Sequence, residues 1–317
     1  MVDITIQPLS DDLPFGARVG GVDHDNVADE GVRARLNALF EERGLIVFEG
    51  MAPTLEMQIA VSKVFGPLKE HSYKGITTVE GATPGVMVLD HRPGELGVLE
   101  IDGEELAGWT PWHFDAGYNR ELNRAGVLRA LEIPAEGGMT GFADGIQLYQ
   151  AISPALRDRI EGKEILYHPK LMAINIRYGR PRRLLLHSLA EDVNAMFAAN
   201  AHAERAIHPA VWQRRTGEKV LHVMSWQADG IFGHEDDEGD ALLDAVLKEV
   251  HARVVPYYHA WKPTDMVIWD NWRMLHRGVG YDPKYGRLVH RTTIEGDYGL
   301  GRFEHEGAEG RAAEAMA

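Results

Sequence analysis

Apolar residues recur along the chain with two different periods, which together predict short strands mixed with a few helices. Four apolar side chains fall on one face of a predicted helix over residues 29–43: Val32, Leu36, Leu39 and Phe40. Gly44 is expected to end this helix, and the apolar run LIVF at 45–48 predicts a strand buried on both faces. A second helix is expected to begin at Thr54.

Hydrophobic periodicity predicts further elements along the rest of the chain. It indicates strands at residues 2–7, 220–224, 265–270 and 286–297, and helices after Ser153-Pro154, across 189–209 and across 238–254. Residues 73–108 are rich in glycine and proline and predict an irregular segment, either a lid or binding loop or a solvated surface insertion. We expect one domain over residues 1–303, mainly β with flanking helices (α+β), and a disordered tail at 304–317.

The composition is that of a soluble globular protein, and its charge narrows the choice of partners. The 317 residues carry a formal net charge of −15, which argues against nucleic acid and anionic lipid surfaces. No stretch is apolar enough to span a membrane, and residues 1–16 lack the features of a signal peptide, so we expect a cytoplasmic protein. Since the chain has no cysteine, any metal must be held by nitrogen and oxygen ligands.

The stretch WTPWHFDAGYN, residues 109–119, places a histidine and an aspartate two positions apart. In a strand, His113 and Asp115 would project from one face and Phe114 from the other. An imidazole beside a carboxylate supplies two of the three protein ligands of a two-histidine, one-carboxylate metal site. The pair is also typical of a buried histidine with its hydrogen-bond partner, so the rest of the chain has to decide.

A candidate third ligand and two cations come together within residues 267–297. His276 follows a predicted buried strand, and Arg287 and Arg291 lie four residues apart on the next strand, where they share a face. Two cations on one inward face are unfavourable without an anion to meet them. Because the guanidinium group binds carboxylates in a bidentate manner, the two arginines predict a carboxylate-binding site beside the metal.

Four motifs, taken in order along the chain, resemble the TauD/TfdA family of Fe(II)- and 2-oxoglutarate-dependent dioxygenases. They are HFD at 113–115, GGMT at 137–140, WDN…H at 269–276 and GRLVHR at 286–291. The resemblance implies a double-stranded β-helix, which is a jelly-roll or cupin-like barrel with helices on one side. It also implies an oxygenase that hydroxylates an unactivated C–H bond and releases succinate and CO2.

The resemblance assigns roles to individual residues. The Fe(II) ligands would be His113, Asp115 and His276. The far carboxylate of the cosubstrate 2-oxoglutarate would meet Arg287 and Thr140, and O2 would take a remaining metal position. Arg291 would lie near the other carboxylate of the cosubstrate or bind an anionic group of the substrate. Because the carboxylate ligand is retained, hydroxylation is favoured over halogenation.

The resemblance also suggests which residues contact the substrate and what that substrate is. His71 matches by position a family residue that contacts an anionic head group, and Phe114 stands where the family often has a small hydroxyl residue. With Arg291, these are the candidate substrate contacts. We expect a small anionic molecule such as an aryloxyalkanoate, a sulfonate or another carboxylate, with C–O or C–S cleavage where the hydroxylated carbon bears oxygen or sulfur. We also expect a homo-oligomer, either a dimer or a tetramer.

Two other functions remain open on the sequence. The first is a sensor that holds metal and 2-oxoglutarate on the same barrel without turnover. The second is a metal hydrolase in which two histidines and an aspartate hold zinc. Turnover would exclude the sensor, and dependence on 2-oxoglutarate would exclude the hydrolase, which gives no role to Thr140 or to the arginine pair.

Overall fold

The computed structural model describes residues 4–70, 77–81, 85–94, 97–169, 172–188, 203–296 and 298–306. The helices are α1 (Glu30–Arg43), α2 (Leu55–Phe65), α3 (Gly145–Ala151), α4 (Pro154–Ile160) and α6 (Asp237–Arg253), with a 3-10 turn η1 (Ala173–Asn175). The first ten strands are β1 (Thr5–Pro8), β2 (Ala17–Gly20), β3 (Leu45–Phe48), β4 (Leu68–Lys69), β5 (Met87–His91), β6 (Val98–Ile101), β7 (Glu104–Ala107), β8 (Ala125–Glu132), β9 (Thr140–Asp144) and β10 (Glu164–Tyr167). The others are β11 (Leu184–Ser188), β12 (Ala206–Pro209), β13 (Val211–Gln213), β14 (Lys219–Leu221), β15 (Ala228–Ile231), β16 (Tyr257–His259), β17 (Met266–Asp270), β18 (Met274–Gly278), β19 (Arg287–Ile294) and β20 (Arg302–Phe303).

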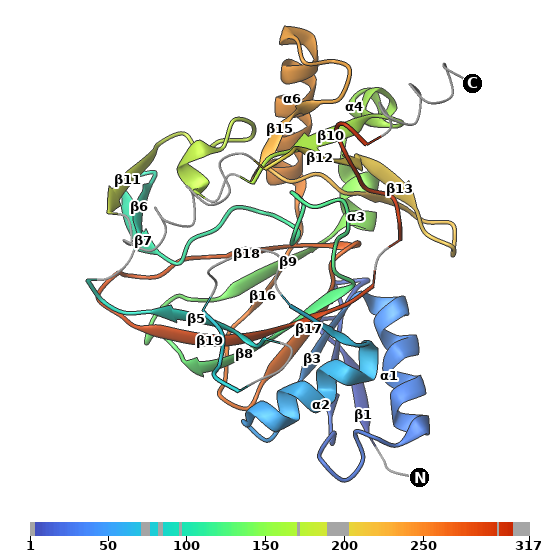
Figure 1. The fold of residues 1–317 in the computed structure, drawn as a ribbon, viewed down its shortest axis with the longest axis vertical. Helices are drawn as coiled ribbons and strands as arrows, with labels where there is room; N and C mark the ends of the chain where they lie inside the picture. The colour runs from blue at the N-terminus through green and yellow to red at the C-terminus, as the bar shows by residue number, and fades with distance from the viewer. Residues whose placement is uncertain are drawn as a thin grey trace.

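An eight-stranded sheet forms the centre of the fold, in the order β1-β2-β3-β17-β8-β19-β4, with β5 also paired to β19 (Figure 1). The central strand β3 is apolar at every position because both of its faces are buried. Ile46 and Phe48 pack on the side of α1 and α2, whereas Leu45 and Val47 pack on the opposite side. The predicted strand at 45–48 is therefore confirmed, and the sheet has two apolar faces that other elements must cover.

Helices α1 and α2 cover one face of this sheet (Figure 1). The Asp29 side chain caps α1 by accepting a hydrogen bond from the backbone N–H of Val32 at 3.0 Å. Gly44 ends the helix in the left-handed region at φ 72°, where glycine is favoured. Thr54 caps α2 in the same way as Asp29 caps α1, through the N–H of Met57 at 3.1 Å. Both helices thus lie where the periodicity and capping residues predict them.

The three-stranded sheet β16-β9-β18 covers the other face of the large sheet. Phe142 of β9 and Trp261, just after β16, meet Trp269 and Val289 of the large sheet in one apolar core. Two sheets stacked face to face over such a core give the predicted jelly-roll architecture. The inner faces of β9, β18 and β19 point into the space between the sheets.

The described parts of segment 73–108 are more regular than its glycine and proline content predicts. They contain β5, which pairs with β19, and the hairpin β6–β7, which pairs with β11. The hairpin turns at Asp102 and Gly103, which both have positive φ, at 52° and 99°. β5 and β6 are stabilised by strand partners far away in the sequence, which a local pattern does not reveal.

Elsewhere the predictions differ from the structure in two places. The helix predicted across 189–209 is wrong at its end, since Ala206–Pro209 is β12 and pairs with β10; residues 189–202 lie outside the described part. Ser153 precedes α4 but makes no capping hydrogen bond with its side chain, and its backbone N–H is bound by Glu249 instead. The other predicted strands and helices are present, with ends shifted by a few residues. Of the predicted tail, only 304–306 is described.

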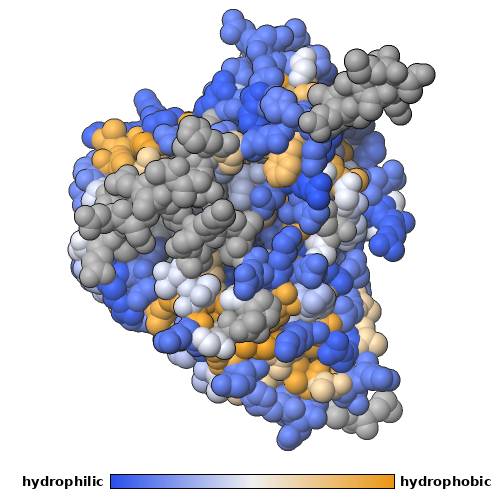
Figure 2. All heavy atoms as spheres, in the orientation of Figure 1, coloured by the Kyte–Doolittle hydropathy of each residue, from blue (hydrophilic) through white to orange (hydrophobic). Residues whose placement is uncertain are grey.

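The visible surface is mainly hydrophilic (Figure 2). Apolar side chains gather around β11, where Leu185 and Leu186 are 42% and 39% exposed. Within the described ranges, no helix is both long and apolar enough to cross a membrane.

Candidate active site

Two histidines are brought together by a reciprocal backbone pair. The N–H of His113 donates to the carbonyl of His276 at 2.9 Å, and the N–H of His276 donates back at 2.8 Å. This antiparallel bridge joins the HFD motif to β18 and brings the two ring centroids to 4.1 Å. Residues far apart in the sequence are thereby fixed side by side through their main chains.

Asp115 is positioned by the side chain of Asn271, in the turn between β17 and β18. Asn271 Oδ1 accepts from the Asp115 N–H at 2.7 Å, and its Nδ2 donates to the Asp115 carbonyl at 3.1 Å. The same Nδ2 also reaches Asn123 at 3.2 Å, so this buried amide is well satisfied. Asn271 belongs to the WDN motif, but the motif alone assigns it no role. The available signal was an asparagine directly after a predicted buried strand, because a buried side-chain amide requires hydrogen-bond partners.

His113, Asp115 and His276 together form a potential metal site. Each offers one ligand atom, and the three atoms lie within 4.8 Å of one another. His113 Nδ1 is 2.8 Å from the carbonyl oxygen of Pro111, which leaves Nε2 free for a metal. Nε2 of His276 faces Asp115 Oδ1 at 3.6 Å. Two imidazoles and a carboxylate on one face fit Fe(II) with open coordination positions.

Burial and charge keep these groups in the form that binds metal. Burial lowers the pKa of both His113 and His276, which keeps the imidazoles neutral. Burial alone would raise the pKa of Asp115, but Arg291 and the two histidines outweigh it and hold that pKa at about 2. The site therefore presents two neutral nitrogen donors and one anionic oxygen donor.

Arg291 forms an ion pair with Asp115, the carboxylate of the candidate metal site. Its two terminal nitrogens lie 2.8 and 2.5 Å from the two oxygens of Asp115, and both side chains are buried. The guanidinium also lies over the ring of Trp269, 5.5 Å from its centroid. Arg291 thus already has an anionic partner within the protein, which favours a role in orienting Asp115.

Arg287 shares the inner face of β19 with Val289 and Arg291. Among the described residues it has no carboxylate partner, and burial lowers its pKa. In the sheet, Asp90 and Glu132 pair with the neighbouring Leu288, and both carboxylates are bound to Arg92. A cation held in this way is available for an anion that comes from outside the protein.

Thr140 lies on the facing sheet, on the same side of β9 as Phe142. Phe142 is paired in register with His276, so this face of β9 is also the face of the metal site. Trp261 donates its indole N–H to Thr140 Oγ1 at 3.0 Å. Because that oxygen acts as acceptor, the hydroxyl hydrogen of Thr140 remains free to donate to a ligand.

Of the predicted substrate contacts, Phe114 is not supported by the structure, and His71 is not tested by it. Phe114 is 1% exposed and stacks on His222 with centroids 3.8 Å apart, in the core behind the motif. A ring so enclosed has no surface for a substrate. The HFD motif forms an isolated bridge at His113 and a turn rather than a strand, and its phenylalanine packs into the core while its histidine and aspartate meet His276. His71 lies outside the described residues. Trp226 is better placed, since its ring meets His113 edge-on at 4.9 Å.

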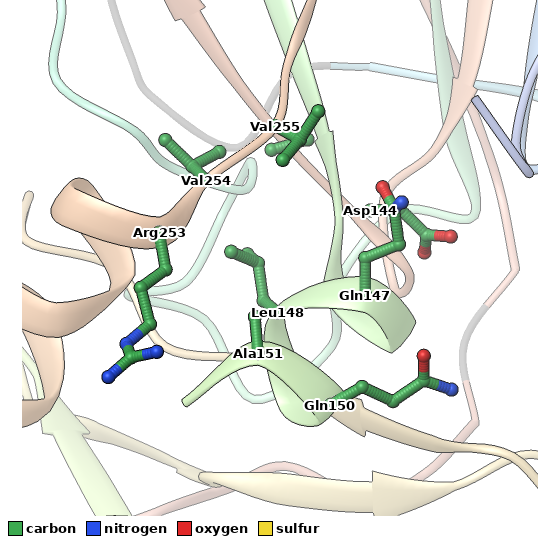
Figure 3. Close-up of a pocket in the computed structure, with 9 residues that line it drawn as sticks. Asp144, Gln147, Leu148, Gln150, Ala151, Arg253, Val254 and Val255 are labelled. Atoms are coloured by element: carbon green, nitrogen blue, oxygen red, sulfur yellow. The ribbon is translucent and has the colours of Figure 1, made fainter. Parts of the chain in front are cut away.

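A separate cavity of about 240 Å³ lies on the outer side of β9, between α3 and the end of α6 (Figure 3). Leu148, Val254 and Val255 are among its lining residues, as is Arg253, which is paired with Glu249 at 2.8 Å. The lining contains none of the three candidate metal ligands. This cavity is therefore distinct from the space between the two sheets.

Replacing Asn271 with alanine should weaken Fe(II) binding about ten- to a hundredfold, the range found when outer partners of metal ligands are lost. The reason is that the backbone of Asp115 would lose both of its hydrogen bonds to the Asn271 side chain. Fe(II) affinity measured by anaerobic titration checks this, with the melting temperature recorded alongside. Unchanged affinity in a folded variant would contradict the positioning role.

Two stacked sheets with a two-histidine, one-carboxylate site define the class of jelly-roll proteins with a potential site for a single metal ion. The sequence model of the "Taurine catabolism dioxygenase TauD, TfdA family" matches residues 5–293. The chain belongs to this family, as its motifs predicted. It is accordingly a 2-oxoglutarate-dependent dioxygenase, with a His–Asp–His set that fits Fe(II).

Individual relatives agree with this assignment. The chain is 29% identical over 303 residues to (S)-phenoxypropionate/alpha-ketoglutarate-dioxygenase of Sphingobium herbicidovorans, covering 92% of this chain and 95% of that protein. It is 27% identical over 298 residues to alpha-ketoglutarate-dependent 2,4-dichlorophenoxyacetate dioxygenase of Cupriavidus pinatubonensis, covering 89% and 95%. A taurine dioxygenase structure from Burkholderia xenovorans shares the fold, with TM-score 0.66, 23% identity and coverage of 93% and 91%.

Proposed function

We propose that this protein hydroxylates a C–H bond of a small organic anion and converts 2-oxoglutarate and O2 to succinate and CO2. The observation that carries the proposal is the potential metal set His113, Asp115 and His276 together with Arg287, an arginine that has no carboxylate partner among the described residues. An arginine without a carboxylate partner in the part of the chain that the structure describes supports binding of a dicarboxylate cosubstrate, which a hydrolase would not need. Bound Fe(II) would supply the oxygen-activating chemistry.

The residues around the metal would divide the remaining work. Arg287 and the free hydroxyl hydrogen of Thr140 would bind the far carboxylate of 2-oxoglutarate. Arg291 would hold Asp115 in the orientation needed for metal binding, which is a positioning role. Trp226 and the apolar core between the sheets would limit water at the reacting centre.

Among substrate classes, we favour an aryloxyalkanoate. Four curated relatives carry the names of phenoxypropionate or 2,4-dichlorophenoxyacetate dioxygenases, and others are named pentalenolactone F synthase and alkylsulfatase. In such a substrate, hydroxylation of the carbon that bears the ether oxygen gives a hemiacetal, which collapses to a phenol and a carbonyl compound. The aromatic wall formed by Trp226 beside His113 suits an aryl group.

The direct test is turnover with a panel of aryloxyalkanoates, sulfonates and other carboxylates, in the presence of Fe(II), 2-oxoglutarate and air. We expect succinate and a phenol in equal amounts from one or more aryloxyalkanoates. Succinate coupled to a different compound class would replace the aryloxyalkanoate assignment. Absence of succinate with every compound, despite bound metal and 2-oxoglutarate, would favour the sensor. Product formation without 2-oxoglutarate would favour the hydrolase.

The expected homo-oligomer and the cytoplasmic location belong to the same proposal. Light scattering on the purified protein tests the first, with the mass of a dimer or tetramer as the expected result. Fractionation of cells that express the protein tests the second.

A further inference from the structure

Two residues without a role in the proposed function lie next to Arg287. His91 is the direct cross-strand partner of Arg287 in the pairing of β5 with β19, so their side chains share a face. His91 Nδ1 lies 2.9 Å from the hydroxyl oxygen of Tyr281, which belongs to the loop between β18 and β19. The charge of Arg287 acts on both groups: it lowers the pKa of His91 and opposes the rise in the pKa of Tyr281 that burial causes. The three side chains therefore form one cluster, hereafter the Arg287 cluster.

The phenol ring of Tyr281 is held firmly in this cluster. Its backbone exchanges two hydrogen bonds with Ala107, at 2.9 and 3.1 Å. The ring packs directly over Gly108, where an added Cβ would fall 2.7 Å from a ring carbon. The residue is 3% exposed, so its hydroxyl is presented from a fixed position inside the protein. Such rigidity is typical of a group that orients a ligand.

The Arg287 cluster contains a surplus of donors. Burial and the neighbouring Arg287 lower the pKa of His91 to about 4, so the imidazole is neutral near pH 7 and carries one N–H. With that hydrogen on Nδ1, His91 donates to the Tyr281 oxygen, whose own hydrogen is then free. The guanidinium of Arg287 adds further donors, with no carboxylate among the described residues to accept them.

We propose that the Tyr281 hydroxyl donates a second hydrogen bond to the far carboxylate of 2-oxoglutarate, beside Arg287, and that His91 orients this hydroxyl. Tyr281 then binds the cosubstrate by its terminal carboxylate, and His91 is a positioning residue that acts through Tyr281. The inference rests on the proposed function, since it assumes that Arg287 receives this group.

The experiment compares two ligands of equal length in the anaerobic, Fe(II)-loaded protein. 2-Oxoglutarate carries the far carboxylate, whereas 2-oxovalerate has the same five-carbon chain without it. Dissociation constants are measured from the visible absorption that develops when a 2-oxo acid chelates the metal. Tyr281→Phe should weaken 2-oxoglutarate about tenfold and leave 2-oxovalerate within about twofold, because a hydrogen bond to a charged group is lost only with the first ligand.

Further variants separate this role from a structural one. His91→Leu should shift 2-oxoglutarate in the same direction, and His91→Asn, which keeps an N–H near the position of Nδ1, should restore part of the affinity. Tyr285→Phe, in the same loop, is the matched control and should change neither ligand. Equal weakening of both ligands by Tyr281→Phe, or no change in either, would overturn the proposal.

The Arg287→Gln variant distinguishes failure of this inference from failure of the proposed function, which places 2-oxoglutarate at Arg287. If Arg287→Gln weakens 2-oxoglutarate selectively and Tyr281→Phe does not, only the roles of Tyr281 and His91 are overturned. If Arg287→Gln has no effect on 2-oxoglutarate, the cosubstrate site itself is overturned, together with the inference.

Discussion

Replacing His276 with alanine should reduce turnover by more than about a hundredfold. Losing an outer partner of a metal ligand typically costs ten- to a hundredfold, and His276 is itself a candidate ligand. The variant should also bind Fe(II) weakly, because two protein ligands would remain of three. Succinate formation and equilibrium Fe(II) binding are the two measurements.

The matched control for this variant is His187→Ala. His187 is 41% exposed and pairs with Glu100 near the surface, away from the metal set. Its replacement should leave both activity and Fe(II) binding close to those of the parent protein. A His276→Ala protein with parental turnover would contradict the assignment of the metal site.

Replacing Arg291 with glutamine should destabilise the metal-free protein by about 3–5 kcal/mol. Breaking a buried ion pair on one side leaves an uncompensated charge, here Asp115, in a low-dielectric interior. The free energy of unfolding in urea, measured with a chelator present, gives the result. Replacing both partners, with Asp115→Asn and Arg291→Gln, should recover part of the loss because no buried charge is left unpaired.

The exposed pair of Arg159 with Glu238 provides the control, and Arg159→Gln should cost no more than about 1 kcal/mol. A comparably small loss for Arg291→Gln would contradict the buried-pair account. The pair also predicts a pH dependence. Folding lowers the pKa of Asp115 from 3.8 to about 2, so its stabilisation is complete above about pH 4 and is lost as pH falls towards 2.

Local patterns in the sequence were sufficient for the elements that carry their own signals. Asp29 and Gly44 bracket α1, and the uniform apolarity of 45–48 reports a strand buried on both faces. β5 and β12 could not be predicted in this way, because their pairing partners lie far along the chain. The glycine and proline around β5 predicted an irregular segment, and the alanine-rich sequence before β12 predicted a helix. In both places the observed strand depends on pairing with a distant strand, which a short stretch of sequence does not show.

The candidate site shows the same limit. The spacing of His113 and Asp115 predicted that they lie together and that Phe114 points away, which is the observed arrangement although the motif is an isolated bridge and a turn rather than a strand. The spacing of the two arginines on β19 put them on one face. The sequence could not tell which arginine is satisfied internally, since that depends on where Asp115 lies relative to β19. The structure pairs Arg291 with Asp115 and leaves Arg287 without a carboxylate among the described residues. The hydrogen bonds from the Asn271 side chain to the backbone of Asp115 likewise depend on the tertiary arrangement.

The most direct test of the central claim follows oxygen atoms. The Fe(II)-loaded protein is incubated with 2-oxoglutarate and the aryloxyalkanoate panel under oxygen-18 gas, and the succinate is analysed by mass spectrometry. A 2-oxoglutarate-dependent dioxygenase predicts one oxygen-18 atom per succinate, with none formed by His113→Ala. Absence of succinate, or the same unlabelled succinate from both proteins, would contradict the account.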